Sequence, residues 1–198
     1  MRRIFIGTLV VLTIALINGC ANRKITRVDP SETIDLSGRW NDSDSRLVSE
    51  EMIGDLLTSA WIPRYLEAND KRPVVVVGLV ENKSHEHINS ETFIKDVEKA
   101  IIRDGNIRLV VAGEKRNELR KERAEQQDYA SPETTKKWGK ELGADFILQG
   151  TINSIVDSYK KQKVVTYQID LQLTNIETNE VVWMGDKKIK KQISDRVL

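Results

Sequence analysis

The sequence predicts a single two-layer α/β domain in which helices cover one face of a mostly antiparallel sheet. The last third of the chain holds three strand-like runs joined by short polar links. Upstream, two amphipathic segments flank a run of consecutive β-branched residues. A sheet with one dry face needs a second layer to cover it, and the amphipathic segments are the candidates.

Residues 164–174 form the clearest predicted strand, because their apolar and polar side chains alternate. Residues 146–152 alternate in the same way, and a third run begins at Val181. Polar links at 160–163 and 177–180 separate the three runs. We therefore predict a C-terminal three-stranded antiparallel meander. Its dry face would include Val165, Tyr167, Ile169, Leu171 and Leu173.

The beginning of the chain has the features of a secretory signal. A basic start, Met1-Arg2-Arg3, precedes a largely apolar run over residues 4–17. That run is shorter than the roughly 20 residues that span a bilayer, so a signal peptide over 1–19 is predicted. Gly19-Cys20 resembles a bacterial lipobox, in which the cysteine is lipidated and becomes the mature N-terminus. An ordinary signal with an incidental cysteine is the alternative.

Cys20 is the only cysteine, so the sequence excludes a disulfide framework and a thiolate metal cluster. Several acyl chains on Cys20 would anchor the protein stably to a membrane. Inner-membrane lipoproteins often carry aspartate after the cysteine, where this chain has Ala21, so the resemblance favours the outer membrane. We predict a lipidated N-terminus and short tether over 20–43, followed by a globular domain over 44–198.

Trp40 is unusual in a polar tether, and two interpretations are open. It packs back on the domain, or it is exposed, together with Arg39, as a contact for a partner. The first helix is predicted to start at Ser43 or Asp44, either of which can cap it. Pro63 is expected to end or kink it. Its core face would be formed by Val48, Met52, Ile53, Leu56, Leu57, Ala60 and Trp61.

Residues 74–80 are apolar on both faces, which is typical of a central strand. A second helix is predicted from Asn89 or Ser90 to Gly105, a good C-terminal stop. Residues 107–111 form the next predicted strand. The buried face of the second helix would be formed by Phe93, Ile94, Val97, Ala100 and Ile101.

The run 114–125 is charged almost throughout, and its i,i+4 pairs favour a helix. A solvated helix is one interpretation, and a partner surface that uses Arg116, Arg120 and Arg123 is the other. Ser131-Pro132-Glu133 predicts the start of a further short helix ending at Gly143. We expect Trp138 and Leu142 to face inward from that helix.

Composition and motifs argue against several functions. The net charge is +1 with 31% charged residues, so no overall basic field favours nucleic acid. The sequence contains no phosphate-binding loop, nucleophile elbow or zinc motif. His85 and His87 could bind a metal, but solvated loop residues are the default interpretation. We therefore expect a binding protein that is not an enzyme and has no cofactor besides the lipid on Cys20.

Five stretches of the mature chain together match the pattern of a known family: 35–46, 73–78, 92–96, 141–145 and 175–183. On these stretches, the mature chain resembles the LpoB-type family of outer-membrane lipoproteins, which activate class A penicillin-binding proteins. The resemblance covers almost everything after Cys20. Some of its features recur in the related curli-secretion and Tol-B N-terminal type domains.

The resemblance implies a non-catalytic, lipid-anchored protein on the periplasmic face of the outer membrane. Such a protein would bind a bifunctional peptidoglycan synthase and raise its glycosyltransferase and transpeptidase activities. We expect a monomer or small oligomer of a Tol-B N-terminal-like fold. The alternatives are an envelope-assembly or secretion-channel lipoprotein of the curli-secretion type and a lipid-anchored enzyme. A channel would need additional hairpins, and every predicted strand is already needed for the core.

Overall fold

The computed structural model describes residues 25–131, 133–134 and 141–194. The chain divides into two compact units, residues 1–32 and 33–198. Of the first unit, residues 25–32 are described; they are exposed and include a turn in which Glu32 donates to the Asp29 carbonyl. The predicted signal peptide and Cys20 lie outside the described residues. The site and the fold below belong to the second unit.

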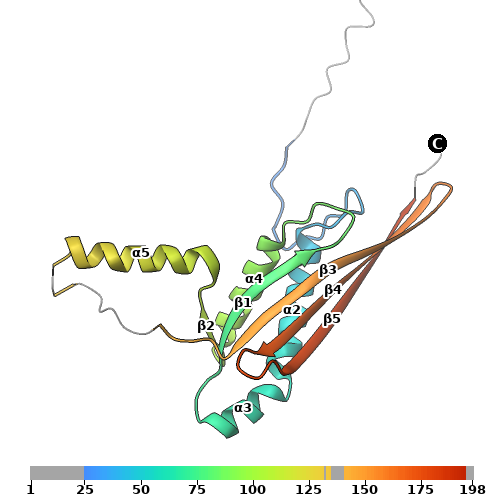
Figure 1. Cartoon of the computed structure of the whole chain (residues 1–198). Helices are drawn as coiled ribbons and strands as arrows, with labels where there is room; N and C mark the ends of the chain where they lie inside the picture. Colours follow the sequence, from blue (N-terminus) through green and yellow to red (C-terminus); the bar gives the residue numbers. More distant parts are fainter. Residues whose placement is uncertain (1–24, 132, 135–140, 195–198) are drawn as a thin grey trace, which may run out of the picture. The chain divides into compact units, whose positions relative to one another are not determined.

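A five-stranded sheet with the order β2-β1-β3-β4-β5 forms one layer of this unit (Figure 1). β1 is an interior strand that runs parallel to both of its neighbours, β2 and β3, whereas β3, β4 and β5 form the predicted antiparallel meander. The sheet is therefore mixed, with most of its paired residues in the meander. The strands are β1 (Val74–Asn82), β2 (Arg108–Val110), β3 (Phe146–Tyr159), β4 (Gln162–Asn175) and β5 (Val181–Ser194).

The strict alternation in β4 correctly predicts its buried face. Every second residue from Val165 to Leu173 is buried, and Tyr167 and Ile169 have no exposed surface. The polar residues between them lie on the opposite face. In the β3–β4 pair, Ile152 lies opposite Ile169, and both are buried.

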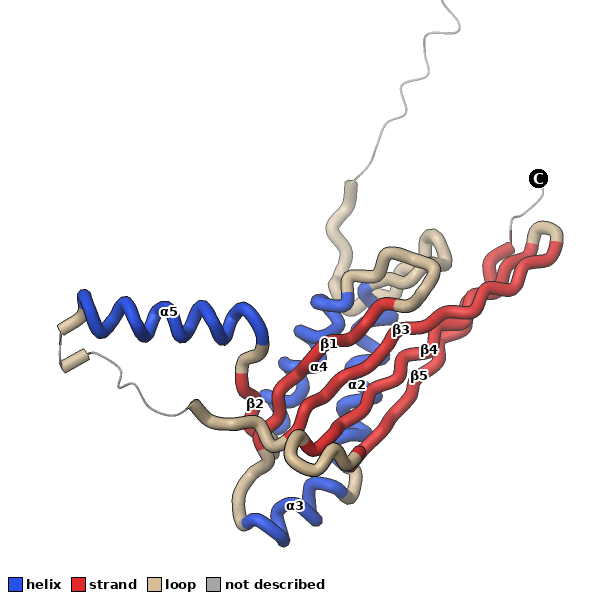
Figure 2. The backbone as a smooth tube through the Cα atoms, in the orientation of Figure 1, coloured by secondary structure: helices blue, strands red, loops and turns tan. Residues whose placement is uncertain are grey.

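The meander is longer than the sequence indicates. β3 continues to Tyr159, and a tight turn at Lys160-Lys161 leads into β4. Lys160 has a φ of 53°, the left-handed conformation that such a tight hairpin requires. Figure 2 shows the ends of β3, β4 and β5 extending as a ribbon past the helices. No described helix covers this part of the meander, so the apolar alternation of its sequence is weak. For that reason the predicted link at 160–163 is longer than the observed turn at Lys160-Lys161.

Helices α2 (Asp42–Thr58) and α4 (Ser90–Asp104) cover one face of the sheet (Figure 1). α4 begins at the Asn89 cap and ends at Gly105, as predicted. α2 begins one residue before the predicted position because Asn41 is its cap. Their buried side chains form the core with the sheet: Val48, Met52, Ile53, Leu56, Phe93, Val97 and Ile101.

Pro63 does not end the first helix. α2 already stops at Thr58, and Pro63 lies in the first turn of a separate helix, α3 (Trp61–Asn69). Proline is tolerated in a first turn because the backbone there has no helical hydrogen bond to donate. Ala60, predicted on the core face, lies between the two helices and is exposed. Trp61 is buried, and its indole N–H donates to the Leu56 carbonyl at 2.9 Å.

The charged run forms helix α5 (Gly113–Tyr129), which contains no buried residue. The predicted helix that follows it is wrong in its described part. Residues 141–144 are not helical, and Leu142 is 44% exposed rather than facing inward. Trp138 lies outside the described residues. Among the helices that the structure describes, none combines the length and apolar character needed to cross a bilayer.

Candidate functional site

The chain enters α2 through a segment that hydrogen bonds hold tightly. The Asn41 side chain accepts from the Asp44 amide at 3.1 Å, and Asp44 accepts from the Asn41 amide at 3.0 Å. This reciprocal pair is a capping box, which satisfies two backbone donors at the helix start. It also fixes the backbone direction of the residues just before it, Arg39 and Trp40.

Trp40 packs on the domain, as the first interpretation of this residue predicts. Its ring meets the ring of Tyr167 edge-on, with the centroids 5.5 Å apart. Its backbone N–H donates to the Glu86 carboxylate at 3.1 Å. Trp40 is therefore half-buried and anchored by two elements that are distant in sequence. The remaining exposed surface of the indole faces a pocket.

His85 is part of the same arrangement. Its imidazole stacks on the Tyr167 ring, with the two ring centroids 6.4 Å apart. Its Nδ1 lies 2.7 Å from the Ser154 hydroxyl. Its Nε2 lies 3.4 Å from the Glu86 carboxylate. Thus β3, β4 and the β1–α4 loop together orient one imidazole. Within the described ranges, no cluster of three or more His, Cys, Asp or Glu side chains could hold a metal ion.

The Tyr167 ring contacts the rings of both Trp40 and His85. It is fully buried in β4, and burial, followed by the nearby Glu86 carboxylate, raises the pKa of its phenol. The phenol therefore stays neutral over the physiological pH range. A neutral, buried ring is a fixed support for Trp40 and His85.

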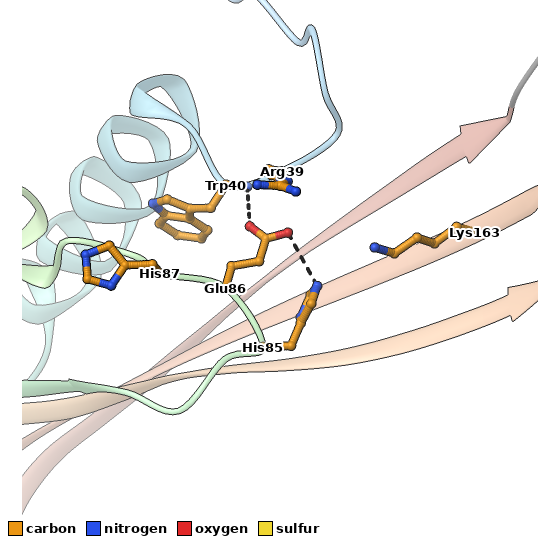
Figure 3. Close-up of a pocket in the computed structure, with 6 residues that line it drawn as sticks. All are labelled: Arg39, Trp40, His85, Glu86, His87 and Lys163. Atoms are coloured by element: carbon orange, nitrogen blue, oxygen red, sulfur yellow. Dashed lines mark hydrogen bonds and ion pairs between the residues drawn. The ribbon is translucent and has the colours of Figure 1, made fainter.

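These groups surround a cavity of about 310 Å³, which we call the Trp40 pocket (Figure 3). Cationic or ionisable side chains dominate it, and Glu86 is its single carboxylate among the lining residues. Lys163 reaches it from β4, with its amine directed toward Glu86 and His85. The lining residues are Arg39, Trp40, His85, Glu86, His87 and Lys163.

A partly buried ion-pair cluster fixes the segment that leads to this pocket. Lys191 of β5 lies 2.6 Å from both Asp35 and Asp44 and donates to the Arg39 carbonyl at 3.0 Å. Burial alone would lower the Lys191 pKa, but hydrogen bonds to the two carboxylates outweigh it and raise the pKa. Lys191 is therefore charged and joins the last strand to the start of the first helix.

The three arginines predicted as partner contacts lie elsewhere, on α5. Arg116 Nε donates to the Val111 carbonyl at 2.8 Å. Arg120 and Arg123 both bind Glu141, at 2.9 and 2.8 Å. Hydrogen bonds from Arg120 first, and from Arg123, lower the pKa of Glu141 to about 2. This carboxylate thus ties α5 to the chain segment before β3.

A second hollow of about 320 Å³ lies between α5, β2 and this segment. We call it the α5 groove. Its apolar side chains are partly exposed, with Leu119 at 49%. The structure therefore separates the predicted contact residues into two places: Arg39 and Trp40 at the pocket, and Arg116 and Arg123 at the groove. Arg120 lines neither hollow but binds Glu141 of the groove. The groove is lined by Leu109, Val110, Val111, Arg116, Leu119, Arg123, Glu141 and Leu142.

Sequence reasoning misses three members of these sites: Glu86, Lys163 and Glu141. Glu86 and Lys163 are ordinary polar residues in a loop and a strand, and only the fold brings them to Trp40. Glu141 lies 21 residues from Arg120, outside the range of helical pair rules. No local signal distinguishes these residues from other surface charges.

The described chain is a two-layer α/β domain with two hollows, one lined mainly by polar and charged side chains and one mainly by apolar side chains. Comparison with protein-family models assigns the chain to a family. The family model described as "Peptidoglycan-synthase activator LpoB" matches residues 44–189. The chain belongs to the LpoB family of peptidoglycan-synthase activators. A search of curated proteins gives no match.

Several solved structures are similar to this chain. The LpoB C-terminal domain from Escherichia coli is 18% identical with a TM-score of 0.46, covering 77% of this chain and 99% of that one. The corresponding domain from Salmonella enterica is 16% identical with a TM-score of 0.42, covering 74% and 98%. Lipoprotein GNA1162 from Neisseria meningitidis is 15% identical with a TM-score of 0.36, covering 61% and 83%.

Proposed function

We propose that this protein is a non-catalytic lipoprotein that binds a bifunctional class A penicillin-binding protein in the periplasm and activates it. The observation that carries the proposal is the family match, which extends over most of the folded unit. An activator of this kind works by binding the active conformation of the synthase more tightly than the inactive one. Activation therefore requires a rigid contact surface and no chemistry of its own.

The protein would act from the outer membrane, held by acyl chains on Cys20. The lipobox-like sequence before Cys20 and the following Ala21 support this location. A flexible chain as long as the predicted tether, about 22 residues, would span roughly 25 Å on average and about 75 Å when extended. Asp35 is already bonded to Lys191 of the folded unit, which shortens the part available as a tether. Contact with a synthase at the inner membrane would therefore need a nearly extended tether or a partner that reaches outward.

The α5 groove is the surface we assign to the synthase. Leu119, Leu142 and Val111 are each more than 40% exposed, and apolar side chains surrounded by charges are typical of protein contacts. Arg116 and Arg123 line the same groove. Arginine is enriched in such contacts because its planar group donates several hydrogen bonds at once. Arg39 and Trp40 would be a second, separate contact.

A direct test uses the full chain in detergent, purified class A synthases from the same cell and lipid-linked substrate. We expect a several-fold rise in glycan polymerisation. Leu119→Asp should reduce this rise, because it places an unpaired charge in the contact. The exposed position Leu79 offers a matched control, since Leu79→Asp changes an exposed leucine outside the groove. Equal activation by both variants would remove the groove from the proposal.

Lipidation needs its own test. Metabolic labelling with an alkyne fatty acid should mark the wild-type protein, and Cys20→Ser should abolish the label. Membrane fractionation of the same cells should place the labelled protein with the outer membrane. Labelled protein in the inner-membrane fraction would contradict the proposed location.

A further inference from the structure

Two cations of the Trp40 pocket have no partner in the described part of the chain. The charged groups of Arg39 and Lys163 line the cavity but make no hydrogen bond or ion pair with a described residue. Lys191, on the neighbouring strand, differs because two carboxylates already bind it. Two cations without a partner in the described part of the chain therefore line the same cavity.

The charge balance of the pocket fits one additional negative charge. Arg39 and Lys163 contribute two positive charges and Glu86 one negative charge, which gives +1 when the imidazoles are neutral. Glu86 is already engaged by the Trp40 amide and by His85. A carboxylate would neutralise the remaining charge, whereas a phosphate dianion would leave the pocket with a net charge of −1 and would cost more to desolvate. The pocket thus favours a monoanion.

The size and lining of the Trp40 pocket fit the C-terminal end of a short peptide. A volume of about 310 Å³ is at the lower limit of ligand-sized cavities, with room for a carboxylate and roughly one or two small residues. The indole of Trp40 offers apolar surface beside the cations, and an aromatic face packs well against an aliphatic side chain. Figure 3 shows Arg39, Glu86 and Lys163 arranged around the same opening.

The recognition groups are also held in place before any ligand arrives. Trp40 and His85 both rest on the fully buried Tyr167. The Arg39 carbonyl is bound by Lys191, so the backbone that carries the guanidinium is fixed. Preorganised groups lose little entropy on binding, which strengthens recognition of a small ligand.

We propose that the Trp40 pocket binds the terminal carboxylate of a short peptide. Arg39 and Lys163 would donate to the carboxylate oxygens, and Trp40 would pack against the adjoining residue. This binding activity goes beyond synthase activation and does not use the α5 groove. It would share Arg39 and Trp40 with the proposed second contact, and the titration below tests it without a synthase.

The test follows the tryptophan indole N–H signals of the full chain in detergent by NMR during titration with N-acetyl-dialanine. We expect saturable movement of the Trp40 signal, assigned with Trp40→Phe, with a dissociation constant on the order of 1 mM or below. The signals of the buried Trp61 and Trp183 should stay in place. The C-terminal amide of the same peptide should bind about tenfold more weakly because it lacks the charge. Inorganic phosphate should bind more weakly than the acid.

Lys163→Gln should weaken binding of the acid roughly tenfold, and Lys161→Gln is the matched control. Lys161 lies in the exposed hairpin turn two residues away and does not line the pocket. An unmoved Trp40 signal would overturn the proposal. Equal binding of acid and amide, tighter binding of phosphate, or equal affinity of the two lysine variants would each do the same. No synthase is present in this titration, so its failure leaves the proposed activation untouched.

Discussion

The Lys191 amine lies 2.6 Å from the Asp44 carboxylate, and the two side chains are only 10% and 8% exposed. Asp44 is also the acidic member of the capping box that starts α2. One ion pair therefore connects the end of the last strand with the start of the first helix. It holds the segment that carries Arg39 and Trp40 against the sheet. Both proposed activities depend on a rigid domain, and this pair is one of its main long-range connections.

Removing Lys191 should destabilise the fold. Lys191→Met leaves Asp44 and Asp35 without their cation, and an uncompensated buried charge costs several kcal/mol. We expect a loss of about 2–3 kcal/mol in the free energy of unfolding, since the pair is slightly exposed. Urea unfolding of the full chain measures this. Lys188→Met, at an exposed lysine on the same strand, is the control. Equal stability of the two variants would refute the role of the pair.

Two glycines should respond to alanine in opposite directions. A Cβ on Gly150 would lie 2.2 Å from the Asp170 carbonyl oxygen, so the strands must move apart. Gly150→Ala should cost roughly 1–3 kcal/mol. Gly54 lies in α2 with open space around it, so Gly54→Ala should stabilise by about 0.5–1 kcal/mol through helix propensity. Thermal unfolding compares them, and a shift of the same sign in both would contradict the packing described.

Asp145 should make stability depend on acid pH. It accepts hydrogen bonds from the Tyr65 hydroxyl at 2.7 Å and the Val74 amide at 2.9 Å. Burial alone would raise its pKa, but these bonds and Lys71 outweigh it and lower the pKa. Its contribution is therefore complete above the unfolded pKa of about 3.9 and is lost as the pH falls through the lower folded value.

Between pH 5 and pH 3, wild-type protein should consequently lose more stability in urea than Asp145→Asn does. Asp128→Asn, at an exposed carboxylate of α5, should behave like wild type. An identical pH dependence of Asp145→Asn and wild type would show that the carboxylate contributes nothing in its folded position.

Glu141 should control the mobility of α5. Its ion pairs with Arg120 and Arg123 connect a helix with no buried residue to the segment before β3. Glu141→Gln removes the charge, so we expect faster amide hydrogen exchange across α5. Glu118→Gln changes an exposed acid on the helix itself and should have little effect. Unchanged exchange in Glu141→Gln would mean that another contact holds the helix.

Local sequence patterns predict most of this fold because its core elements bury one regular face. The alternation of β4 and the caps of α4 are examples, since each signal lies within a few neighbouring residues. The hairpin beyond Ile152 escapes prediction because no helix covers it and its apolar pattern fades. The break between α2 and α3 escapes for a different reason: Pro63 suggests a stop, but it is compatible with the first turn of a new helix.

Only some residues of the two candidate sites could be predicted from the sequence. Trp40 is notable as a tryptophan in a polar segment, and the α5 arginines belong to a run whose only apolar residues are Leu119 and Ala124. Their partners are separated from them by long stretches of chain, such as the 46 residues between Trp40 and Glu86. Contacts between residues so far apart in the sequence depend on how the strands of the sheet are connected. The local sequence around one residue does not specify that topology.

The most direct test of the account is glycan polymerisation by a purified class A synthase, with and without the full chain in detergent. The account predicts a several-fold higher rate when the protein is added, with Leu119→Asp reducing the effect and Leu79→Asp retaining it. An unchanged rate with every class A synthase of the same cell would contradict the proposed activation.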